Sequence, residues 1–187
     1  MIRIILMTAL LLISITNIYA ESPTDKGVYS LGGSISYMNI DSDDGSDEDI
    51  FLFSPSGRYF IFDNIAMGVS LVYRKSSNDT ADSDSYGIGP SLRYYLPEKT
   101  MNPFFEVAYS YSKNKSEIFE YTLKSTSNDY SIGCGLDYFL SRNVSIEPMI
   151  RYSWRKYNYK DYQSLIGPMD LDEKALYIGI GVNWFIF

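Results

Sequence analysis

Residues 176–184, which read LYIGIGVNW, alternate between large apolar side chains and small or polar ones. The large positions are Leu176, Ile178, Ile180, Val182 and Trp184, and the positions between them are Tyr177, Gly179, Gly181 and Asn183. Successive side chains of a β-strand point to opposite faces, so a period of two predicts a strand. One face of this strand is bulky and apolar, and the other is narrow.

The same alternation recurs along the chain upstream of this stretch. With 176–184 it makes eight strands, over residues 30–37, 51–61, 65–74, 86–94, 105–112, 130–138 and 144–154. Gly and Ser occupy much of the second face in nearly every run. Pro55, Pro90 and Pro148 fall on the bulky face in mid-strand, where a proline requires a bulge or a missing ladder bond.

The small face predicts the inside of a closed barrel, because Gly and Ser cover a solvent-exposed sheet face poorly but fit a narrow interior. The bulky face must then meet an apolar medium. In lipid, a sheet has to close on itself so that no strand edge is left unpaired. The pattern therefore predicts an all-β fold, an eight-stranded antiparallel up-and-down transmembrane β-barrel. A soluble lipocalin-like binder would need the reverse arrangement, with an apolar interior and a polar exterior.

The predicted connections alternate in length. Three are short, at residues 62–64, 97–103 and 141–143, and four are long and polar, at residues 40–49, 75–85, 113–129 and 155–174. Aromatic residues cluster at both ends of the strands, as in membrane girdles. Near the short turns these are Tyr59, Tyr94, Phe105, Tyr138 and Trp184, and near the long loops Tyr37, Tyr73, Tyr86, Tyr111, Tyr130, Tyr152 and Trp154.

The N-terminal segment has the pattern of a secretory signal peptide. Arg3 precedes an apolar run from Ile4 to Ile15, and Ala20 offers a cleavage point. The run is short for a membrane-spanning helix, which needs about 20 apolar residues. We therefore expect a signal peptide at residues 1–20 and a barrel domain at residues 21–187.

The composition excludes several classes of function. The net charge is −7, whereas nucleic-acid binding needs basic patches. His is absent, which removes the commonest general base and metal ligand, and the single Cys cannot form an internal disulfide. The chain also has no GxSxG nucleophile motif. The sequence thus predicts neither an enzyme nor a cofactor-binding protein.

Several hairpin segments resemble a known family. FSPSGRYFIFDNIAMGVSLVY, YGIGPSLRYYL, IGCGLDYFLSRNVSIEPMIRYSW and YIGIGVNWFIF are similar to successive hairpins of the small outer-membrane β-barrel domain family. That family is similar in build to outer-membrane protein X and to the membrane barrel of outer-membrane protein A. The terminal Phe187 resembles the aromatic residue through which the barrel-assembly machinery recognises its clients. Asn183 shares a face with Phe185 and Phe187, which departs from the usual apolar alternation at this end.

The resemblance implies a monomeric protein in the outer membrane of a Gram-negative bacterium, in contact with outer-membrane lipid and lipopolysaccharide. The short turns of such barrels face the periplasm, so both termini are expected there. We expect a role in envelope structure or in surface interaction, with the long loops contacting a host or another surface ligand. The alternative is a small pore or transporter for small or hydrophobic solutes.

Six charged residues fall on the interior face of the predicted strands. They are Arg58, Arg93, Arg151, Glu106, Asp137 and Glu147. Charges in a narrow interior must pair to offset desolvation, so we interpret them as one network that plugs the lumen. The functional alternative is a gated ion path or a catalytic pair of carboxylates. Arg93 and Glu106 lie at matching heights on adjacent strands and form the best candidate pair. Asp137 and Glu147 are like charges on neighbouring strands, so we expect Arg151 or Arg58 to reach them.

Two of the loops carry distinctive side chains. The first loop has a cluster of acids that is a weak candidate for a divalent-cation site: Asp41, Asp43, Asp44, Asp47, Glu48 and Asp49. Its spacing differs from that of an EF-hand, and a solvated acidic loop is the simpler interpretation. The last loop interleaves cations with aromatics in a composition suited to sugar or protein contact: Arg155, Lys156, Tyr157, Tyr159, Lys160 and Tyr162. Cys134 is predicted to face lipid as a small apolar side chain.

Overall fold

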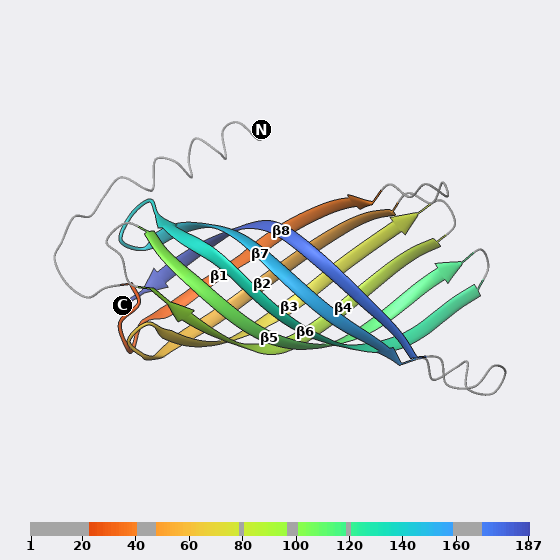
Figure 1. Ribbon diagram of the computed structural model, residues 1–187, viewed down its shortest axis with the longest axis horizontal. Helices are drawn as coiled ribbons and strands as arrows, with labels where there is room; N and C mark the ends of the chain where they lie inside the picture. Colours follow the sequence, from red (N-terminus) through yellow and green to blue (C-terminus); the bar gives the residue numbers. More distant parts are fainter. Residues whose placement is uncertain (1–22, 41–47, 79–80, 97–100, 119–120, 159–169) are drawn as a thin grey trace.

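The computed structural model describes residues 23–40, 48–78, 81–96, 101–118, 121–158 and 170–187. They form eight antiparallel strands in sequence order around a closed barrel (Figure 1). The strands are β1 (Tyr29–Ile40), β2 (Glu48–Phe62), β3 (Ile65–Asn78), β4 (Ala81–Tyr95), β5 (Met101–Ile118), β6 (Tyr121–Phe139), β7 (Val144–Asn158) and β8 (Asp170–Ile186). The predicted fold class is confirmed. The predicted signal peptide at residues 1–20 lies outside the described residues.

The alternation of large and small side chains in the sequence correctly predicts which face of each strand points outward and which points into the lumen. Large apolar residues face outward on every strand, and Ile178 is 69% exposed and Trp184 62% exposed. Interior positions such as Ser34, Ser91 and Ser131 are buried. Within the described residues, no helix is long and apolar enough to cross a membrane.

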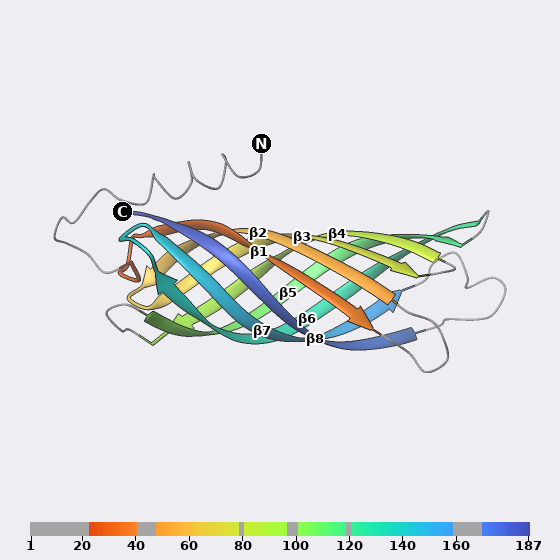
Figure 2. The same cartoon turned by 90° about the horizontal axis from the view of Figure 1, so that it is seen from above.

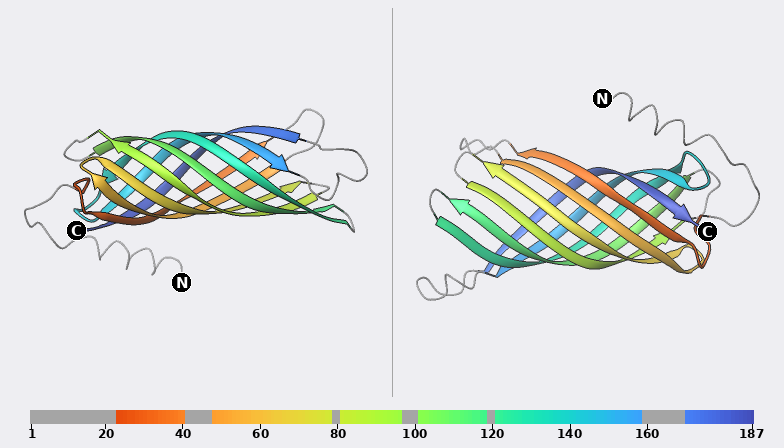
Figure 3. Two further views of the ribbon diagram at one scale, coloured as in Figure 1. Left: turned by 90° about the horizontal axis from the view of Figure 1, so that it is seen from below. Right: turned by 180° about the vertical axis from the view of Figure 1, so that it is seen from behind.

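Two of the four predicted long loops are wrong. Most residues of 75–85 and 113–129 belong to strands, because β3 extends to Asn78, β4 begins at Ala81, β5 extends to Ile118 and β6 begins at Tyr121. Residues 79–80 and 119–120 lie outside the described residues. Both segments are rich in Ser, Thr, Asn and charged residues, so an apolar alternation does not reveal them as strands. The strands therefore run well beyond the apolar band at the end opposite the C-terminus (Figures 2 and 3).

The end that carries the C-terminus is closed by tight turns and by the segment before β1. In the β2–β3 turn, Asn64 adopts a positive φ of 65°, a conformation that Asn tolerates. The hydroxyl of Thr24 donates to Asn64 Oδ1 at 2.8 Å, and the backbone amide of Asn64 donates to Thr24 O at 2.7 Å. These bonds hold the segment before β1 across the turn.

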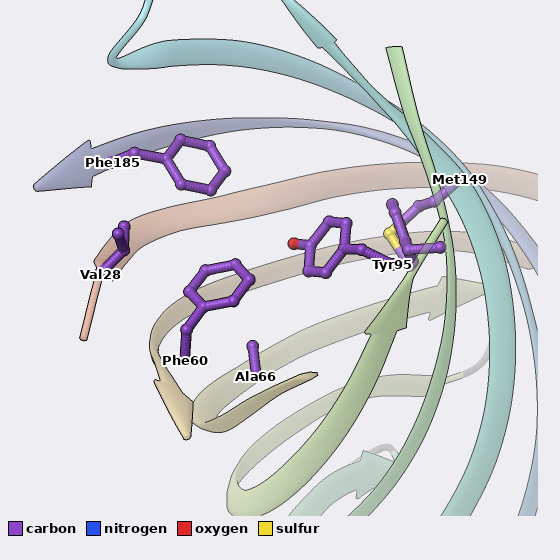
Figure 4. Packing of buried hydrophobic residues seen from close by; sticks show 7 residues of the cluster. Val28, Phe60, Ala66, Tyr95, Met149 and Phe185 are labelled. Atoms are coloured by element: carbon purple, nitrogen blue, oxygen red, sulfur yellow. The ribbon is translucent and has the colours of Figure 1, made fainter. Parts of the chain in front are cut away.

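An apolar cluster fills the lumen at this end (Figure 4). It consists of Val28, Phe60, Ala66, Tyr95, Phe104, Met149 and Phe185. Phe185 is fully buried, so the last strand turns this aromatic residue inward near its end. Phe187 instead lies outside the strand, 40% exposed, with the Arg142 guanidinium 4.1 Å from its ring centre. The imperfect alternation of Asn183, Phe185 and Phe187 thus reflects an inward anchor followed by an outward terminal ring.

The three mid-strand prolines interrupt ladders without shifting the register. Cα pairing between β4 and β5 stops after Ile88–Tyr111 and resumes at Ser91–Ala108 in the same register, which leaves Pro90 unpaired on that side. Gaps of the same kind flank Pro55 in the β2–β3 ladder and Pro148 in the β6–β7 ladder. A missing ladder bond, rather than a bulge, accommodates each proline.

Candidate functional site

Arg93 of β4 lies at the centre of the lumen, directly above the apolar cluster. The side chain is fully buried and forms ion pairs with Glu106 at 2.8 Å and Glu147 at 2.6 Å. Its Nη1 lies 3.8 Å from Asp137 and donates to the hydroxyl of Tyr95 at 3.2 Å. One guanidinium thus contacts three carboxylates from three strands.

Aromatic rings of the apolar cluster support this guanidinium from below. The Arg93 Cζ atom lies 3.7 Å from the ring centre of Phe104 and 5.7 Å from that of Tyr95. A desolvated cation over a ring face gains a cation–π contribution. The apolar cluster and the charged layer therefore form one continuous packing unit.

The structure brings all six predicted interior charges together. Glu106 lies beside three guanidinium groups, with Arg93 at 2.8 Å, Arg151 at 2.9 Å and Arg58 at 3.7 Å. The expected pair of Arg93 and Glu106 is present. Three cations face three anions, so this inner layer is neutral overall.

The repulsion between Asp137 and Glu147 is offset by groups other than those expected. Arg93 reaches both carboxylates, whereas we expected Arg151 or Arg58 to do so. The second group is Asn183, whose Nδ2 donates to Asp137 at 2.9 Å and to Glu147 at 2.6 Å. Asn183 faces the lumen in the middle of the charged layer, so its amide can bridge two acids that would otherwise repel each other.

A second charged layer lies farther toward the long-strand end, and sequence reasoning missed it. Arg155 of β7 pairs with Asp129 of β6 at 2.9 Å, and Arg74 of β3 pairs with Glu173 of β8 at 3.0 Å. The hydroxyl of Tyr157 donates to Glu173 at 2.6 Å. The sequence contains the information needed to find it, because these residues occupy the alternate strand positions that face the lumen. Four of the five were assigned to loops, and Arg74 was left out of the network.

The predicted contact surface of the last loop is therefore wrong in part. Arg155 is 6% exposed and Tyr157 is half-buried, and both point into the lumen as members of this outer layer. Lys156 points outward and is exposed. Tyr159, Lys160 and Tyr162 lie outside the described residues.

The interior space is divided by the two charged layers. Small cavities of about 30 Å³ and 10 Å³ lie between and within them, lined mainly by serine and charged side chains. Beyond the outer layer, a cavity of about 580 Å³ opens at the end away from the C-terminus. We call this cavity the vestibule. Its lining residues include Arg74, Ser85, Asn114 and Glu173.

The acidic cluster of the first loop falls largely outside the described residues, which is the case for Asp41, Asp43, Asp44 and Asp47. Asp49 is in β2 and accepts a hydrogen bond from the Tyr37 hydroxyl at 2.6 Å. Among the residues that the structure describes, no group of three or more acids, Cys or His could hold a metal ion. Cys134 is a free, exposed thiol on the outward face, as predicted.

Comparison with protein families gives a match to the outer membrane protein beta-barrel domain over residues 7–183. The chain belongs to this family. The family resemblance inferred from the hairpin segments is thereby confirmed, and the protein is an outer-membrane β-barrel protein of the Gram-negative type. A search of curated proteins found no match.

Solved structures of outer-membrane barrels share the fold. Neisserial surface protein A is 18% identical, with a TM-score of 0.63 over 85% of this chain and 99% of that one. The N-terminal barrel of Pseudomonas aeruginosa OprF is 12% identical, with a TM-score of 0.59 over 86% of this chain and 98% of that one. Ail, the attachment invasion locus protein of Yersinia pestis, is 13% identical, with a TM-score of 0.53 over 86% of this chain and 99% of that one. At these identities the likeness shows the fold alone.

Proposed function

We propose that this outer-membrane barrel is a closed structural protein that acts in envelope structure or surface interaction through its long-strand end. The supporting observation is that three successive layers of side chains close the lumen. An apolar cluster, an inner charged layer and an outer charged layer follow one another from the turn end outward. No catalytic role is proposed for the paired acids, because each has an Arg partner within ion-pair distance.

The proposed orientation places the turn end and both termini in the periplasm. Short turns face the periplasm in barrels of this type, and the long extracellular parts face outward. The extended ends of β5 and β6 would then project from the cell surface, where a host or another surface ligand could be contacted. We propose that the protein works as a monomer.

Outward-facing lysines support a contact with lipopolysaccharide. Lys75, Lys113 and Lys156 each follow an outward aromatic residue of the outer girdle by two positions, so they lie on the same face just beyond the apolar band. Cations at this level meet the anionic head groups of the membrane surface.

The lumen is expected to carry no steady ionic current. Purified protein reconstituted in a planar bilayer should give a flat trace, because ion-paired side chains lie across the lumen in two layers and the cavities described at their level measure about 30 Å³ and 10 Å³. The matched control is a variant with the inner layer trimmed, Arg93→Ala with Glu106→Ala. Stable, uniform single-channel steps from the unaltered protein would contradict the closed barrel and favour the small pore or transporter.

Removing Phe187 should lower the amount of protein assembled in the outer membrane. The terminal ring is exposed and stacks on Arg142, so it is available as an assembly signal and also fixes the end of the last strand. Membrane fractionation and gel mobility with and without boiling measure the assembled fraction. Phe187→Tyr, which keeps an aromatic ring, and deletion of Asp79 serve as controls. Equal outer-membrane levels of the truncated and intact chains would refute this role.

A further inference from the structure

The barrel wall is incompletely closed where its first and last strands meet. Pairing between β1 and β8 runs from Tyr29–Ile186 to Ser36–Gly179 and then stops. Beyond that point β1 continues to Ile40 against β2, and β8 extends back to Asp170 against β7. Figure 1 shows the two strands diverging toward the long-strand end. We call this opening the β1–β8 seam.

The vestibule lies against the strand edge at this seam. Its lining includes four consecutive residues of β8, which are Glu173, Lys174, Ala175 and Leu176. All four belong to the part of β8 that has no β1 partner, because the pairing ends at Gly179. Glu173 and Ala175 have the parity of the lumen, whereas Lys174 and Leu176 have the parity of the outer face, where Leu176 is 54% exposed. A single open strand edge therefore separates the vestibule from the lipid-facing surface of β8.

The chemistry of the lining changes from the lumen to the seam. Deep in the vestibule the walls are polar, with Ser76, Ser85 and Asn114 above the Arg74 guanidinium. Toward the seam they become apolar, with Ala175 and Leu176 on β8. Outside the seam, the apolar surface continues along β8 to Ile178, which is 69% exposed. A ligand that matches this gradient has a polar head and a hydrocarbon chain.

The charges of the lining favour an anionic head group. The lining holds two cations, Arg74 and Lys174, and one acid, Glu173, which pairs with Arg74 at 3.0 Å. Arg74 is 6% exposed, and its Nε has no hydrogen-bond partner among the described residues. A buried guanidinium N–H without a partner carries a desolvation penalty that an anionic oxygen would relieve. The volume of about 580 Å³ falls within the range of small-molecule sites.

We propose that the vestibule binds a single-chain anionic amphiphile. The head group lies in the lumen over Arg74, beside the open strand edge that carries Lys174, and the hydrocarbon chain passes over the edge of β8 beside Leu176 into the outer leaflet. Carboxylate and phosphate head groups share this chemistry. The inference depends on the proposed function only for the side of the membrane on which the vestibule opens.

The test uses the isotopically labelled full chain in phosphatidylcholine nanodiscs, titrated with dodecanoate, with lysophosphatidylglycerol and with uncharged dodecanol. Backbone amide shifts of Ser85, Asn114 and Leu176 should change saturably with one or both anionic probes. The responding probe identifies the head group. Dodecanol should bind about tenfold more weakly, which corresponds to the loss of one charge-assisted interaction. Equal binding of dodecanol, or no saturable shift with either anion, would overturn the proposal.

Two matched pairs of variants locate the site. Lys174→Gln should weaken binding of the anion about fivefold, whereas Lys156→Gln, an exposed lysine on the neighbouring strand, should leave it unchanged. With a spin label at the end of the ligand's hydrocarbon chain, the amide signal of Leu176 should broaden strongly. The signal of Leu71, which is equally exposed at 54% on β3, should not broaden. Equal broadening at both leucines would mean general partitioning into the bilayer and would overturn the site. These signals report on the vestibule alone, so the outcome of the binding test does not depend on the outcome of the conductance measurement.

Discussion

Replacing Arg93 by alanine is expected to lower the free energy of unfolding by about 3–5 kcal/mol, because a buried ion pair that loses one partner leaves the other charge uncompensated. Arg93 is fully buried and contacts Glu106, Glu147 and Asp137. Its removal would leave Glu147 and Asp137 facing each other with Asn183 as their shared donor. Urea unfolding of the protein folded in lipid vesicles measures the loss.

A double-mutant cycle separates the energy of the ion pair between Arg93 and Glu106 from the packing contribution of each side chain. Glu106→Ala alone should also destabilise, and Arg93→Ala with Glu106→Ala should be more stable than the sum of the single losses predicts. Arg151→Ala is the graded control, since this arginine is 20% exposed in its side chain and contacts Glu106 alone among the ion pairs of the layer. Strict additivity would mean that the two residues do not interact. Neutral single variants would mean that the layer is hydrated.

The fold could be predicted from sequence because the membrane makes the apolar face unambiguous. Outward residues such as Ile180 and Trp184 meet lipid, so the period of two is strong wherever a strand crosses the apolar band. The interior charges followed from the same parity. Arg93 and Glu106 could even be paired, because the short turn between β4 and β5 sets their relative height.

Outside the apolar band that reasoning fails. In the extended parts of β5 and β6 both faces are polar, and residues such as Lys113, Asn114 and Lys115 carry no hydrophobic alternation. Arg155 and Glu173 of the outer layer were assigned to a loop for the same reason, whereas Arg74 fell within a predicted strand and was left out of the network. The β1–β8 seam depends on the pairing of the two strands most distant in sequence, and a local pattern carries no information on where that pairing ends. The bridging role of Asn183 likewise depends on where two other strands place their acids.

Replacing Asn183 by leucine is the second change with a large expected effect. Asn183 is 1% exposed, donates to Asp137 and Glu147, and accepts from Arg58 at 3.1 Å. Hydrogen bonds to charged groups contribute about 1.5–3 kcal/mol each, so we expect a loss of about 3 kcal/mol or more in the free energy of unfolding. Leucine has a similar volume, so the loss would come from polarity rather than from a cavity.

Asn128→Leu is the matched control, because Asn128 lies on the outward face of β6, where it accepts a hydrogen bond from the Tyr109 hydroxyl at 2.7 Å. That variant should change the stability by less than about 1 kcal/mol. Adding Asp137→Asn to Asn183→Leu should restore part of the loss, since it removes the like charge beside Glu147 and supplies an amide donor in its place. Equal effects of the two Asn→Leu changes, or no recovery in the double variant, would show that Asn183 does not hold the two acids together. The same unfolding measurement in lipid vesicles decides between these outcomes.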